Sequence, residues 1–209
     1  VSAVPPKDYQ PAPMEKLDDE TYRDERGDIY RISATTHDLM RYQRNRENYV
    51  APTLESVQRE IDALEQEPAG DPNDSRWEFV RHAVKEMKDT HFILVLCGDV
   101  AFPGFGATEE EFWMNLLLEP EVCTKIAELQ GKRVLRQIPV FAQLDVDGIM
   151  PCGDLGSSQG MLASPKIYRE MAYPWNKAMA DRAHAHGLKI LKHCCGHVWP
   201  VIDELAEIY

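Results

Sequence analysis

Phe92-Ile-Leu-Val-Leu-Cys97, followed directly by Gly98 and Asp99, is the stretch of sequence from which the fold class is predicted. A short, continuous apolar run that ends at a glycine is typical of a strand buried on both faces of a parallel sheet. Similar but weaker strand patterns occur at 147–152 and 188–191. Amphipathic helical patterns separate the three strands, for example after the Thr108 cap and from Ser164 onward. The alternation of helices and strands predicts parallel βα units and therefore an α/β fold.

The first third of the chain has a different pattern, and we predict two domains, 1–75 and 76–209. Val1–Pro13 is rich in proline and is expected to be an extended arm. Tyr22–Ile32 places Gly27-Asp28 between two β-prone segments, which predicts a hairpin. Thr53 is the expected cap of a helix through Leu64, and Ser75 with Glu78 forms a possible capping box for the next one.

Composition narrows the class of protein. The 209 residues include 23 Lys and Arg against 35 Asp and Glu, for a formal net charge of -12. This balance argues against nucleic acid and anionic membrane surfaces as partners, because both are bound through clustered cations. An apolar run of the ~20 residues that a membrane helix needs is absent from the sequence. Five cysteines are too few for a disulfide scaffold, so we expect reduced thiols and a cytoplasmic location. The opening Val-Ser leads us to expect that the natural start precedes Val1.

Polar, metal-binding side chains follow all three predicted strands. The strands end in Cys97-Gly98-Asp99, Cys152-Gly153-Asp154 and His193-Cys194-Cys195-Gly196. Ligands and catalytic groups collect at the carboxyl ends of parallel strands. Thiolate and imidazole are the ligands that Zn²⁺ prefers, with a carboxylate oxygen as a third possibility. The sequence therefore predicts a metal or catalytic site at this edge of the sheet.

His193 and Cys195 are the candidate zinc ligands. Their spacing allows both side chains to point the same way from an extended backbone, while Cys194 points elsewhere. A purely structural role is an equally open interpretation of this tripeptide. A catalytic zinc usually has three protein ligands, so a third would come from Cys97, Cys152, an Asp or sequence beyond Tyr209. Asp154, in the Gly-rich loop after the second strand, is the candidate catalytic carboxylate, although this loop also fits an ordinary βα turn.

Four motifs in the second half of the chain, in this order and spacing, resemble the uroporphyrinogen decarboxylase superfamily. They are Gly153–Gly160 (GDLGSSQG), Ser164–Glu170 (SPKIYRE), His184–Lys189 (HAHGLK) and His193–Gly196 (HCCG). The superfamily fold is a (β/α)8 TIM barrel with its active site at the carboxyl ends of the strands. The resemblance implies that this chain is a middle portion of such a barrel, with earlier strands before Val1 and later strands after Tyr209.

The pattern His193-x-Cys195-Gly196 resembles the cobalamin-dependent methyltransferase branch, in which it supplies two of three zinc ligands. The third ligand of that branch is a downstream cysteine, which here would lie beyond Tyr209. The resemblance implies a zinc-dependent methyltransferase that moves a methyl group between a small thiol or methoxy-type substrate and a corrinoid (cobalamin) carried by a partner protein. Asp154 would then position the substrate or a zinc ligand.

Two other functions remain open. Decarboxylases of the same superfamily use no metal and bind a tetrapyrrole through basic residues, and another carboxylate substrate is also conceivable. Their arginine-rich signature is not seen in this sequence. The second alternative is a non-catalytic part of a barrel that needs a partner chain, because exposed sheet edges and apolar faces are unfavourable in a monomer.

Overall fold

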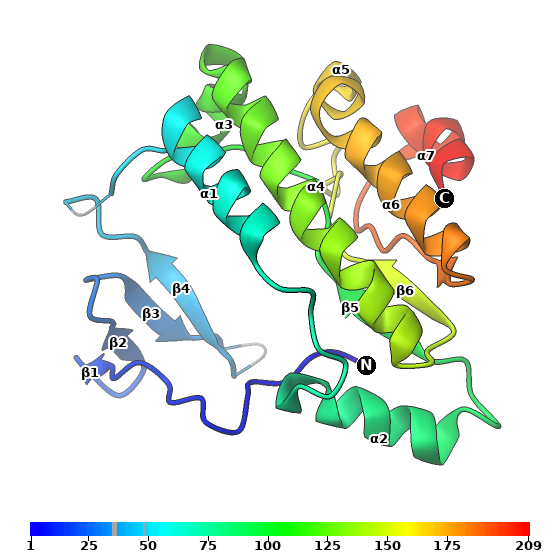
Figure 1. Ribbon diagram of the computed structural model, residues 1–209. Coiled ribbons are helices and arrows are strands. Elements are labelled where there is room, and N and C mark those ends of the chain that lie inside the picture. The colour runs from blue at the N-terminus through cyan, green and yellow to red at the C-terminus, as the bar shows by residue number, and fades with distance from the viewer. Residues whose placement is uncertain (35–36, 48) are drawn as a thin grey trace.

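The computed structural model describes residues 1–34, 37–47 and 49–209, whose strands form two separate sheets (Figure 1). The antiparallel sheet, in the order β1-β2-β3-β4, consists of β1 (Glu15–Lys16), β2 (Thr21–Arg23), β3 (Ile29–Ile32) and β4 (Leu39–Gln43). The parallel sheet, in the order β5-β6-β7, consists of β5 (Leu94–Cys97), β6 (Gly148–Pro151) and β7 (Lys189–Ile190). The prediction of three parallel strands that alternate with helices is therefore confirmed.

The prediction of a (β/α)8 barrel, or a middle portion of one, is wrong for the described residues. Their parallel strands form an open sheet of three, and the other four strands pair antiparallel in a sheet of their own. Within the described residues, a further βα strand does not pair with the free edge of β5. Instead Val1 lies along it, where its amino group donates to the Leu94 carbonyl and its own carbonyl accepts from the Leu96 N–H. The local βα signals were correct, but barrel closure depends on pairings between strands that these signals do not specify.

The helices begin near the predicted capping residues. They are α1 (Leu54–Gln66), η1 (Ser75–Trp77), α2 (Glu78–Met87), α3 (Glu109–Leu118), α4 (Pro120–Gln143), α5 (Pro165–Ile167), η2 (Tyr168–Ala172), α6 (Tyr173–Ala185), η3 (Trp199–Val201) and α7 (Ile202–Ile208). Thr53 and Thr108 cap α1 and α3 through their side-chain oxygens. The expected Ser75–Glu78 box is wrong, because Asp74 accepts the Arg76 N–H and caps η1 instead. Within the described residues, none of the helices has both the length and the apolar character needed to cross a membrane.

The main core lies between the parallel sheet and the helices α4 and α6, which run side by side over it (Figure 1). Val95 and Ile149 of the sheet are completely buried, as are Ile138 of α4 and Met179 of α6. The expectation that β5 is buried on both faces is wrong, since Leu96 is 42% exposed. The helices cover one face of this strand, and side chains that alternate to the other face remain accessible.

A second core cluster supports the loops that follow the strands. It joins Leu116 of α3, Tyr168 and Met171 of η2 and Leu205 of α7. The expected division of the long helix near Pro174 is confirmed. The helix that Pro165 opens passes through the π-helical turn η2 before α6 begins at Tyr173.

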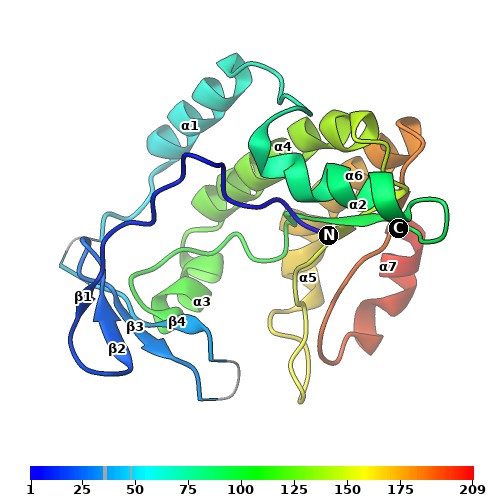
Figure 2. The ribbon, with the colours of Figure 1, turned by 90° about the horizontal axis from the view of Figure 1, so that it is seen from below.

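The predicted hairpin is also confirmed. β2 and β3 pair antiparallel, and Gly27 between them has a φ of 85°, a conformation that glycine adopts without strain. Seen from below, this antiparallel sheet lies to one side of the helices and of the parallel sheet (Figure 2). The polar residues predicted to form a site are all at the carboxyl ends of β5, β6 and β7.

Candidate metal centre

The parallel register of the sheet brings the ends of β6 and β7 together. Ile149 lies opposite Ile190, and beyond the strands Cys152 forms an isolated parallel bridge with His193. The segments that carry Asp154 and Cys195 therefore leave the sheet next to each other. This arrangement was the basis of the prediction that the strand ends form one site, and the structure confirms the proximity.

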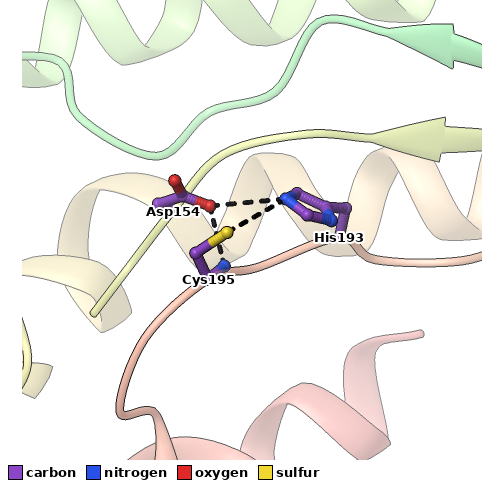
Figure 3. A group of neighbouring side chains, drawn as sticks. All are labelled: Asp154, His193 and Cys195. Atoms are coloured by element: carbon purple, nitrogen blue, oxygen red, sulfur yellow. Dashed lines mark hydrogen bonds and ion pairs between the residues drawn. The ribbon is translucent and has the colours of Figure 1, made fainter. Parts of the chain in front are cut away.

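Asp154, His193 and Cys195, which we call the ligand triad, point toward one another at this edge (Figure 3). One ligand atom from each residue lies within 4.8 Å of the other two. His193 Nε2 is 3.4 Å from Cys195 Sγ and 3.7 Å from Asp154 Oδ1. The side chains of Asp154 and His193 are each 47% exposed, so the triad is open to solvent and to other molecules.

The distances within the triad fit a zinc ion. Zinc bonds to N, O and S ligands are about 2.0–2.3 Å long, which puts neighbouring ligand atoms of a tetrahedral site about 3.3–3.6 Å apart. The two distances from His193 Nε2, 3.4 Å to sulfur and 3.7 Å to oxygen, lie within roughly 0.4 Å of this spacing. Imidazole, thiolate and carboxylate are the donor types found in zinc sites with an open fourth position. Of the sources for a third ligand left open by the sequence, the structure places an aspartate, Asp154, in reach.

Asp154 is held in place by the backbone of the opposite loop. Its Oδ1 accepts the Cys195 N–H at 2.7 Å, and this hydrogen bond is the main reason that the pKa of its carboxyl group lies below the ordinary value. The carboxylate in turn raises the pKa of the Cys195 thiol, mainly by hydrogen bonding to its protonated form. A cation between these groups would favour the thiolate, because it stabilises the negative charge on sulfur.

Cys194 is directed away from the triad, as the alternation along the chain predicts. Its Sγ accepts the Leu155 N–H at 3.1 Å, and the side chain packs against the second core cluster. Burial raises the pKa of the Cys97 thiol to about 12, which makes it unreactive near neutral pH. Cys123 is fully buried in α4, as expected of a core residue.

Tyr168 and Gly196 both help to fix the Gly-rich loop after Asp154. Tyr168 is buried, and its hydroxyl donates to the Leu155 carbonyl and accepts the Ala163 N–H. Gly156 packs against the backbone of Gly196, where a Cβ on Gly196 would lie 2.3 Å from Gly156 carbonyl atoms. The loops that carry Asp154 and Cys195 are thus in direct backbone contact.

Sequence reasoning missed the ion pair that Lys192, next to His193 in the chain, forms with Asp99. Lys192 Nζ contacts the Asp99 carboxylate and donates to the Gly153 carbonyl at 2.6 Å. The side chains of Lys192 and Asp99 are only 7% and 3% exposed. The sequence does show both charged residues directly after predicted strands. No pattern in the neighbouring residues, however, indicates that the Lys192 side chain turns toward the protein interior.

Comparison of the chain with models of known protein families and with curated proteins found no match.

Proposed function

We propose that the chain is a zinc-dependent methyltransferase that transfers a methyl group between a small thiol or methoxy-type substrate and a corrinoid on a partner protein. The observation that carries this proposal is the convergence of one imidazole nitrogen, one thiol sulfur and one carboxylate oxygen at the ends of β6 and β7 (Figure 3). The resemblance of the second half of the chain to the cobalamin-dependent methyltransferase branch of the uroporphyrinogen decarboxylase superfamily adds the reaction type.

The residues of the chain have defined tasks in this proposal. His193, Cys195 and Asp154 would hold the ion, and the Cys195 N–H keeps Asp154 in position. Bound zinc supplies Lewis acidity, which keeps a substrate thiol deprotonated near neutral pH or polarises a methoxy oxygen. The exposure of the triad allows a substrate and a corrinoid domain to approach from the solvent side.

In the thiol direction the reaction balances without a further reagent. The substrate thiolate forms a new sulfur–carbon bond with the methyl group, and the cobalt–carbon bond breaks. The electron pair of that bond stays on cobalt, and the thiol proton goes to solvent. Demethylation of a methoxy substrate would run in the opposite direction: the methyl group would pass from substrate oxygen to reduced cobalt, and the oxygen left behind would take a proton from solvent.

A decarboxylase is the less favoured alternative, because its acidic substrate needs accessible cations. Lys192 is the basic residue next to the triad in the chain, but it is buried and paired with Asp99. A substrate carboxylate would have to displace that partner. Metal-independent decarboxylation of a tetrapyrrole or another carboxylate would support this alternative.

Zinc content separates the alternatives. Purified chain is expected to hold close to one zinc per molecule, measured by elemental analysis. Cys195→Ser is expected to lose the metal, because it removes the thiolate ligand. Cys194→Ser is the matched control and should keep the metal, since this sulfur contacts Leu155 rather than the triad. Equal zinc content in both variants, or none in the unmodified chain, would contradict the proposed site.

Activity is then tested with free methylcobalamin and a panel of small thiols. Loss of the methyl group changes the absorption spectrum of the corrinoid, and we expect this change with the unmodified chain and with Cys194→Ser. Cys195→Ser should show only the background rate. A zinc-loaded chain that transfers no methyl group, even with a corrinoid protein supplied, would favour the non-catalytic alternative.

A further inference from the structure

The buried Asp99–Lys192 pair connects the ends of all three parallel strands. Asp99 follows β5, Gly153 follows β6 and Lys192 follows β7. The Lys192 ammonium bridges the other two, because it contacts the Asp99 carboxylate and donates to the Gly153 carbonyl. Two of these three residues adjoin the ligand triad in the chain, since Gly153 precedes Asp154 and Lys192 precedes His193.

Close packing around Gly153 shows that the loop depends on this arrangement. A Cβ at position 153 would lie 2.7 Å from Asp99 Oδ2 and 2.7 Å from the Ala101 Cβ. The absence of a side chain is therefore what lets the Asp154 loop approach the ion pair. Asp99 is itself oriented, because its Oδ1 accepts the Val100 N–H at 2.7 Å.

Stability alone is a poor explanation for this pair. Removing two charges from water is costly, and well-packed apolar side chains of similar volume often stabilise a fold as well or better. The directional bonds of an ammonium, unlike apolar contacts, fix the separation of the groups that they join.

We propose that Lys192 is a positioning residue, whose bonds to Asp99 and Gly153 set the placement of Asp154 relative to His193 and Cys195. The expected effect on metal affinity rests on the proposed metal site, but the placement of Asp154 is a property of the metal-free chain. Residues that orient metal ligands typically contribute about 10- to 100-fold to metal affinity.

The test replaces both charges together, as Asp99→Leu with Lys192→Met, so that no unpaired charge remains buried. The probe is Co²⁺ in place of zinc, because its visible absorption reports ligand geometry. We expect the double variant to bind Co²⁺ about 10- to 100-fold more weakly than the unmodified chain, with altered absorption bands. Co²⁺ affinity and absorption bands equal to those of the unmodified chain, in a folded double variant, would overturn the inference.

A matched control replaces an ion pair in the helical layer, Lys132→Met with Glu65→Leu, which joins α4 to α1. This variant should keep the Co²⁺ affinity and spectrum of the unmodified chain. If the buried double variant does not fold, Asp99→Asn takes its place. Asp99→Asn retains the size of the side chain and should weaken Co²⁺ binding by a smaller factor. An unchanged Co²⁺ affinity and spectrum in this variant would count against the inference.

A metal-free measurement separates this inference from the proposed function. The amide proton of Cys195, which donates to Asp154 Oδ1, should shift in the NMR spectrum of the buried double variant and not in the control. A chain that binds no Co²⁺ but shows this shift would reject the metal site and retain the positioning role. Suppose instead that the chain binds Co²⁺ but the buried double variant shows neither the shift nor an altered spectrum. This result would retain the metal site and reject the positioning role.

Discussion

The two sheets of this molecule differ in what holds them together. The parallel sheet is covered by α4 and α6, and Val95 and Ile149 at its centre have no exposed surface. In the antiparallel sheet every residue of β4 is exposed, and Met40 on that strand is 57% exposed. Both are sheets in the hydrogen-bonding sense, yet only one is part of a large apolar core.

The antiparallel sheet depends instead on local polar contacts. Asp28, at the turn before β3, accepts the Asn45 N–H at 2.7 Å and pairs with Arg41 at 3.5 Å. The contrast teaches that regular pairing alone says little about how strongly a region resists opening. The number of buried apolar side chains is the better guide, and three predictions follow from this difference.

The largest expected effect separates the sheets directly. Ile149→Ala should lower the free energy of unfolding by about 2–5 kcal/mol, because it leaves a cavity in a closed core. Met40→Ala, its matched control in β4, should change that free energy by less than about 0.5 kcal/mol, since the side chain is largely in solvent. Urea unfolding followed by circular dichroism measures both. Similar losses for the two variants would show that the antiparallel sheet is as tightly packed as the parallel one.

An intermediate effect is expected from Asp28→Ala. It removes the acceptor of the Asn45 N–H, and an unsatisfied amide in a half-buried position costs about 1–3 kcal/mol. We expect the cost to appear locally, as faster hydrogen exchange of the β2 and β3 amides, with little change in the urea midpoint of the whole chain. Asp28→Asn keeps an acceptor oxygen and should exchange more like the unmodified chain. A matching fall in the global midpoint would mean that both sheets unfold as one unit.

The smallest effect concerns the helical layer over the parallel sheet. Glu128 lies between Lys125 and Lys132 on α4, and their ammonium groups lower the pKa of its carboxyl group. A lowered folded-state pKa stabilises the fold above the unfolded value of about 4.3, and this contribution disappears as pH falls through the folded value. Glu128→Gln should therefore cost less than about 1 kcal/mol at pH 7, and this cost should shrink as pH falls below about 4.3. If the difference in unfolding free energy between Glu128→Gln and the unmodified chain grows on acidification, the stabilising role given to the Glu128 carboxylate is contradicted.

Sequence reasoning located β5 and the β2–β3 hairpin from strong local signals, and β6 and β7 from weaker ones. The apolar run before Gly98 and the turn at Gly27 specify β5 and the β2–β3 hairpin from nearby residues alone. β4 carries no such signal, because its residues Leu39–Gln43 are neither alternating nor continuously apolar. Helix α4 extends past Gly131 and Pro139, which look like helix breakers in the sequence. Gly131 is there for packing, since a Cβ would lie 2.5 Å from the Trp175 ring.

The proximity of the candidate residues was predictable for a similar reason, and the contacts that support them were not. Strand ends can be read from the chain, and parallel strands bring their carboxyl ends to one edge, so the proximity of Asp154, His193 and Cys195 follows from topology. The inward turn of Lys192 toward Asp99 depends on the packing of three loops, which no local pattern records. Closure into a barrel failed as a prediction because it depends on strand pairings over long sequence separations.

The π-helical turn η2 has a consequence for how this chain tolerates insertions and deletions. A π-turn accommodates an extra residue within an otherwise α-helical segment. Each residue of an α-helix turns the chain by about 100°. Deleting a single codon within Tyr168–Ala172 would therefore rotate one side of the helix against the other. Either Tyr168 would lose its contacts with the Asp154 loop or Met179 of α6 would leave the main core. The extra residue thus sets the rotation of the helix so that Tyr168 packs in the second core cluster while Met179 packs in the main core.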